Sequence, residues 1–121
     1  MPVEDWIEKW TTSNTVVIEG KVSSNTTFSY SCPLTPTIGT WYHIVVERSG
    51  SSCLMYIDKV SQTVTESTAW SATETNIAST LNIGGANSEF MNGSIKDLII
   101  FKENALSTDQ ISLIYDETFI Y

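Results

Sequence analysis

Apolar and polar positions alternate along much of the chain, and this alternation predicts a series of short strands. In residues 41–48, Tyr42, Ile44 and Val46 share one face while apolar residues also occupy the other, so we expect a strand covered on both sides. Residues 49–52, Ser-Gly-Ser-Ser, form a turn, and residues 53–58 return as the paired strand. The same pattern predicts strands over residues 15–22, 26–32, 81–83 and 94–102, a weaker one over 62–65, and irregular structure over 65–78.

One segment has the pattern of a helix. Residues 107–110, Ser-Thr-Asp-Gln, have the form of a capping box, in which the first and fourth side chains each bond to the backbone of the other residue. Ile111, Leu113, Ile114 and Tyr115 then supply an apolar face, so we expect a short helix near residues 107–116. A last strand is a candidate over residues 118–121.

The length and composition agree with an all-β class. The chain has 121 residues, which fits one domain, and it is rich in Thr, Ser, Ile and Val, which pack well on a pleated surface. Its net charge of −8 argues against nucleic acid and against anionic membranes as partners. The first residues have neither a basic region nor an apolar run, so we expect no signal peptide, and no window predicts a membrane span.

The chain has two cysteines and a single histidine. Cys32 and Cys53 each fall inside a predicted strand, which favours thiols packed in a core, but the sequence leaves open whether the two are bonded. No Cys/His cluster indicates zinc.

Five motifs together resemble one known family. They are residues 39–46 (GTWYHIVV), 54–58 (LMYID), 81–85 (LNIGG), 90–101 (FMNGSIKDLIIF), and 105–107 (ALS) with Gln110, Ile111 and Tyr115. In this order they resemble laminin G-like, pentraxin-like domains of the concanavalin A-like lectin/glucanase superfamily. The resemblance implies an antiparallel two-sheet jelly-roll sandwich, here one domain over residues 1–121 that is shortened at its N-terminus.

The chain departs from that family at two places. Lys59 follows Asp58 where the family usually has glycine, so we expect a different turn there. The early strand of the family is matched by residues 4–10, but the opening strand before it is absent. We therefore expect an open edge beside residues 94–102, which a neighbouring subunit or residues 118–121 would fill.

Few side chains indicate a ligand site. We assign Trp41, His43 and Tyr56 to the core, because they recur at period two inside strands. For glycan binding the candidates are Trp70, which lies in a polar loop, and the turn residues Asn87, Glu89 and Asn92. The resemblance also leaves calcium open as a cofactor, with oxygen ligands drawn from Asp58, Asn87, Glu89, Asn92 and Asp97, although no compact loop has calcium-ligand spacing.

The sequence predicts a binding or structural protein that is not an enzyme. No two carboxylates alternate on one strand face, and His43 is the only candidate base for a nucleophile. Our main hypothesis is a subunit of a virus or phage particle, such as a capsid decoration, fibre or appendage protein, located in the virion. The alternative is a glycan- or protein-binding adhesion module of a cell-surface or secreted protein. Under both hypotheses the partners are other protein subunits at the open edge, or a glycan.

Overall fold

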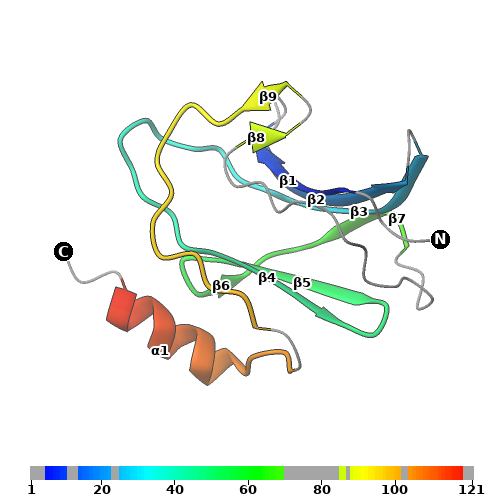
Figure 1. Ribbon diagram of the computed structural model, residues 1–121. Coiled ribbons are helices and arrows are strands. Elements are labelled where there is room, and N and C mark those ends of the chain that lie inside the picture. The colour runs from blue at the N-terminus through cyan, green and yellow to red at the C-terminus, as the bar shows by residue number, and fades with distance from the viewer. Residues whose placement is uncertain are drawn as a thin grey trace.

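The computed structural model describes residues 5–10, 14–22, 25–69, 85–86, 88–101 and 104–118. They form three layers, in which two antiparallel sheets face each other and a helix covers the far side of the second sheet (Figure 1). The prediction of a two-sheet antiparallel sandwich with one short C-terminal helix is confirmed. No helix among the described residues is long and apolar enough to cross a membrane.

The first sheet, sheet A, has the strand order β1-β2-β3-β7, with β1 at Asp5–Trp10, β2 at Thr15–Val22, β3 at Asn25–Pro33 and β7 at Thr65–Thr68. All its pairings are antiparallel, and the register of β2 against β3 shifts between Gly20 and Lys21. Gly20 lies against the ring of Phe28, and a Cβ atom at Gly20 would overlap that ring. This close approach explains why glycine stands inside a strand.

The second sheet, sheet B, has the order β4-β5-β6, with β4 at Ile44–Ser49, β5 at Ser52–Ile57 and β6 at Val60–Ser61. The predicted turn between β4 and β5 is present, and Gly50 supplies its positive φ of 61°. The turn between β5 and β6 contains no glycine: Asp58 and Lys59 themselves have φ angles of 49° and 62°. Two consecutive left-handed residues make a tight hairpin turn, so Lys59 itself adopts the positive φ that a glycine would otherwise supply.

The hydrophobic core lies between the two sheets. Sheet A contributes Val16, Phe28, Tyr30 and Cys32, and sheet B contributes Met55 and Ile57, all of them buried. Partly buried side chains pack around this cluster: Ile18, Leu34, Tyr42, Ile44, Val46, Cys53 and Val64. Tyr42, Ile44 and Val46, which the alternation in residues 41–48 placed on one face, all pack against this core.

Helix α1, at Thr108–Thr118, begins with the predicted capping box. The Ser107 N–H donates to Oε1 of Gln110 at 2.8 Å, and the Gln110 N–H donates to Oγ of Ser107 at 3.2 Å. Ile111, one turn into the helix, is almost fully buried. The helix therefore covers the face of sheet B that is turned away from sheet A (Figure 1).

The prediction of a strand over residues 94–102 is wrong for residues 94–101, the part that the structure describes. Residues 94–101 run as an irregular segment outside any ladder, and Asp97 has a φ of 54°, which no regular strand accommodates. The weak strand predicted over 62–65 lies later, at β7, because residues 62–64 cross from sheet B to sheet A. The strand predicted over residues 81–83 lies outside the described residues. The next described elements along the chain are the short strands β8 (Gly85–Ala86) and β9 (Glu89–Phe90).

Candidate binding surface

The four side chains predicted to bind a ligand do not form a described site. Trp70 and Asn87 lie outside the described residues, and of Glu89 only the backbone is described, in β9. Asn92 is exposed in the segment that follows β9. Glycan binding by these residues therefore stays a prediction. No group of three or more His, Cys, Asp or Glu side chains comes together within the described residues to hold a metal ion.

Two of the three side chains that we assigned to the core lie inside the protein. Tyr56 is buried, and His43 is half-buried with its ring edge-on to Tyr115 of α1, at 5.6 Å between centroids. The backbone of His43 is held by Asp58, because its N–H donates to Oδ1 of Asp58 and its carbonyl accepts from the Asp58 N–H. Trp41 is the exception: it is 44% exposed, so its assignment to the core is wrong.

The turn of Asp58 and Lys59 also holds the helix. Nζ of Lys59 lies 3.0 Å from Oδ1 of Asp116 and 5.1 Å from the ring centroid of Tyr115. The left-handed backbone at Lys59 thus directs a cation to two residues of α1, near the helix end where backbone carbonyls favour positive charge. A glycine at this position would make the turn without strain but could not reach the helix.

Exposed apolar side chains gather in residues 90–101. Seven of them are 46–83% exposed: Phe90, Met91, Ile95, Leu98, Ile99, Ile100 and Phe101. Isolated exposed apolar residues are ordinary in proteins, but seven within twelve residues form a patch of the kind that marks an interaction site.

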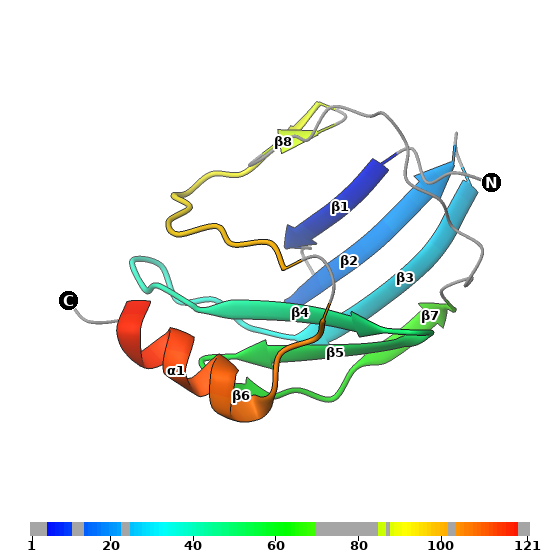
Figure 2. The ribbon, with the colours of Figure 1, turned by 60° about the horizontal axis from the view of Figure 1, so that its bottom comes forward.

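The backbone of this segment is also open to a partner. Within the part of the chain that the structure describes, no backbone hydrogen bond joins residues 91–95 or 97–101 to another segment. β1 and β4 are the terminal strands of their sheets in the described topology, and the segment crosses the side of the sandwich where both lie (Figure 2). Two strand edges, backbone groups outside any described ladder and apolar side chains therefore lie next to one another.

The loop between β3 and β4 extends this surface. Ile38 at the tip of its turn is fully exposed, Trp41 is nearly half exposed, and residues 33–42 carry no charged side chain. The loop lies beside the first part of the exposed segment in both views (Figures 1 and 2). We refer to residues 90–101 together with Ile38 and Trp41 as the apolar surface.

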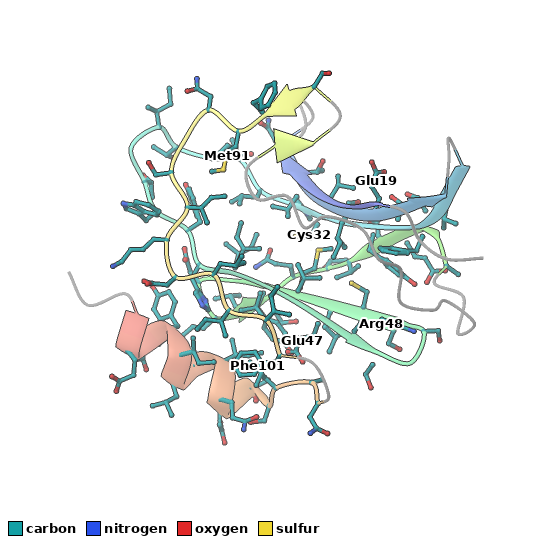
Figure 3. The ribbon with its side chains drawn as sticks, viewed as in Figure 1. Glu19, Cys32, Glu47, Arg48, Met91 and Phe101 are labelled. Atoms are coloured by element: carbon teal, nitrogen blue, oxygen red, sulfur yellow. The ribbon has the colours of Figure 1, made fainter. Side chains whose placement is uncertain are left out.

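A buried carboxyl group lies on the other face of β4. Glu47 is only 8% exposed, on the side of sheet B that faces α1 (Figure 3). Burial raises the pKa of Glu47, and the Leu106 backbone N–H, which donates to the carboxylate, offsets part of that rise. Oε1 has no hydrogen-bond partner in the described structure. A single carboxyl group sealed under a helix has no access to a substrate, so Glu47 affects stability and contributes nothing to the apolar surface.

Comparison with known proteins identifies the family. A laminin G-type family model, described as the concanavalin A-like lectin/glucanases superfamily, matches residues 4–112. The chain belongs to this superfamily. The match covers most of the chain, including both sheets and the start of α1, and it confirms the resemblance of the five sequence motifs.

Other comparisons add less. Among solved structures the chain is similar to residues 221–444 of an S-layer domain-containing protein from Clostridium thermocellum ATCC 27405, at 20% identity and a TM-score of 0.44. That alignment covers 84% of this chain and 51% of the other, so the chain spans about half the length of that structure. No curated protein matches the chain.

The apolar surface could be found from the sequence only in part. The sequence shows the run of apolar residues from Ile95 to Phe101, but the same run is typical of a buried strand. What distinguishes the two is the presence of a pairing partner, and that is a property of the tertiary structure.

Proposed function

We propose that this chain is a non-catalytic recognition module of an extracellular or cell-surface protein, and that it binds a polypeptide partner through the apolar surface. The observation that carries the proposal is the combination, in residues 91–101, of exposed apolar side chains with backbone groups that no described ladder uses. The assignment of residues 1–121 to a single domain belongs to the same proposal, and the one core shared by both sheets supports it.

Strand addition is the binding mode that fits these features. An extended peptide placed beside an open edge gains main-chain hydrogen bonds, and its alternate side chains enter apolar contacts. The terminal strand β4 and the segment 91–101 both offer such groups on one side of the sandwich. A glycan would need polar side chains that converge around aromatic rings. Among the described residues of the surface the polar side chains are Asn92, Ser94, Lys96 and Asp97, and two of these, Lys96 and Asp97, pair with each other.

The size of the apolar surface supports a protein partner. Seven half-exposed side chains in residues 90–101, with a full side chain contributing ~150–200 Å², present roughly 600 Å² of apolar area. This is at the upper end of the largest patch on a typical monomer, and it approaches the ~800 Å² that each partner buries in a standard interface. Ile38 and Trp41 add to it.

Charge decides between a second copy of the chain and a different protein. Two copies would each bring a net charge of −8, and this repulsion opposes their association. Around the apolar surface itself, Lys96 and Asp97 form an ion pair at 3.5 Å and leave little net charge. We therefore assign the surface to an extended, neutral or cationic segment of another protein.

Three other readings have less support. A virion role rests on features of the sequence alone, namely its acidity and its Ser/Thr/Asn-rich, Lys-poor composition, and neither is specific to virus particles. The glycan-binding form of the adhesion alternative agrees with membership of a lectin-type superfamily, although a fold by itself does not determine function. For an enzymatic role we find no set of catalytic side chains among the described residues. The two buried carboxyl groups there are far from a shared site: Glu19 lies in sheet A and Glu47 lies under the helix.

A displayed library of random 12-residue peptides tests the proposal, with a glycan array as the second arm. We expect selected peptides to alternate apolar residues and to lose at least tenfold in affinity for the Ile100→Glu variant. Leu113→Glu is the matched control, because it adds the same charge at an equally exposed apolar position on α1. Peptides that bind Ile100→Glu as tightly as the wild type, or binding confined to glycans, would overturn the proposal.

A further inference from the structure

Cys32 and Cys53 are thiols on opposite sheets, and both are directed into the core between them. Cys32 lies in β3 of sheet A and is buried, and Cys53 in β5 of sheet B packs against the cluster that contains Cys32. Figure 3 shows Cys32 in the space between the sheets. Neither residue belongs to the apolar surface, so their role is independent of the proposed function.

One hydrogen bond and one chain crossing connect β3 and β5 near these cysteines. The Tyr30 hydroxyl donates to the carbonyl of Ser51 at 3.0 Å, two residues before each cysteine. β3 and β5 run in the same direction (Figure 2), so Cys32 follows Tyr30 along β3 while Cys53 follows the turn residue Ser51 at the start of β5, each by two residues. Both cysteines contact the core between the sheets.

The second link is the crossing between the sheets. The Gln62 N–H donates to the carbonyl of Met55 on β5, and Thr65 pairs with Ser31 on β3. Only three residue steps join Gln62 to Thr65, and these span at most ~11 Å. The chain therefore brings β5 near Met55 close to β3 near Ser31, next to the two cysteines. Close approach of two inward-facing thiols is the geometry that an inter-sheet disulfide needs.

We propose that Cys32 and Cys53 form a disulfide that cross-links the two sheets when the protein meets a low-molecular-weight disulfide such as oxidised glutathione. The partly exposed Cys53 attacks first as its thiolate, breaking the S–S bond of oxidised glutathione and releasing one glutathione. The Cys32 thiolate then displaces the second glutathione from Cys53. Two electrons pass from the cysteine pair to oxidised glutathione, and the two thiol protons end on the two glutathione molecules.

The environment of Cys53 sets the expected rate. Burial, together with the neighbouring Cys32, raises the pKa of Cys53 to about 11. The fraction of Cys53 present as thiolate is therefore small at neutral pH. As long as the pH is below this pKa, the fraction increases about tenfold for each unit by which the pH is raised. We expect the cross-linking rate to follow the same dependence, so that the reaction is slow at pH 7 and readily measured at pH 9.

The test uses the full chain, reduced and folded, incubated with oxidised glutathione at pH 7, 8 and 9. We expect the intact mass to fall by about 2 Da, as two hydrogens leave. After trypsin, the peptide of residues 22–48 should be joined to that of residues 49–59. Because the bond closes a loop of about twenty residues, the midpoint of thermal unfolding should rise by roughly 10 °C and fall again on reduction.

The Cys53→Ser and Cys32→Ser variants are the controls, and neither should lose mass. A lasting glutathione adduct on Cys53, a dimer linked through Cys53, or thiols that stay reduced at pH 9 would each overturn the proposal. The mass measurement needs only the wild-type chain, so the test stands even if a serine variant does not fold.

Discussion

Replacing Glu47 by Gln should stabilise the protein at neutral pH and have almost no effect at low pH. The side chain of Glu47 is 8% exposed, and its Oε1 has no hydrogen-bond partner in the described structure. The carboxylate accepts one hydrogen bond from the Leu106 backbone N–H. A buried acceptor left without a partner costs ~1–3 kcal/mol, and more when it is charged. Gln keeps the volume and an acceptor for Leu106, and it removes the charge. We expect a net gain of about 1 kcal/mol, or roughly 3–6 °C in unfolding midpoint.

The direction of the pH dependence follows from the raised pKa of Glu47. Below the ordinary value of 4.5 the carboxyl is protonated in both folded and unfolded chains, so wild type and variant should be equally stable. As the pH rises through that value the unfolded chain ionises first, and the wild type loses stability until the pH exceeds the raised pKa of the folded state. Urea unfolding at pH 3.5, 5 and 7 measures this difference.

Glu66→Gln is the matched control, because Glu66 is an exposed glutamate in β7 and its replacement should change stability by less than ~0.5 kcal/mol. If Glu47→Gln were destabilising at pH 7, or if the difference from wild type were the same at all three pH values, the account of a buried, poorly satisfied carboxylate would be refuted.

Substitutions at three further positions test the fold. Lys59→Gly should stay within ~1 kcal/mol of wild type in urea unfolding, because relief of the strained left-handed backbone offsets loss of the exposed ion pair with Asp116. Lys59→Ala keeps the backbone strain and also loses the ion pair, so it should lose about 1 kcal/mol of stability. Equal losses for the two variants would contradict this. Gly20→Ala should lower the midpoint of thermal unfolding by the equivalent of ~2–3 kcal/mol, since its Cβ overlaps the buried ring of Phe28; a neutral result would contradict the packing. Ser107→Ala should cost about 1 kcal/mol in urea unfolding through the lost helix cap, and no change would mean that the cap is not formed in solution.

Much of the fold could be predicted from local sequence. Alternation located β2, β3, β4 and β5 to within a few residues, because a strand buried on one or both faces needs a fixed side-chain period. The capping box located α1 because both of its hydrogen bonds are made within four residues. In these cases the information that determines the element lies within the element itself.

The remaining features depend on contacts between distant segments. Residues 94–101 have the composition of a strand, but a ladder also needs a partner, and Asp97 adopts a left-handed φ that interrupts the extended chain. Trp41 has the same periodicity as its buried neighbours, yet it lies at the loop end of β4 and is nearly half exposed. Glu47 shares its strand face with Val45, and only the position of α1 shows that this face is covered.

The central claim is that residues 91–95 and 97–101 offer backbone groups that no described strand pairing uses to an incoming strand. Amide hydrogen exchange of the wild-type chain, alone and with a peptide selected from the display library, tests this most directly. The account predicts that these amides exchange far faster than those of β4 and β5 in the free chain, and that the peptide protects them. Slow exchange in the free chain, comparable to β5 and independent of protein concentration, would show that the segment is already paired and would contradict the account.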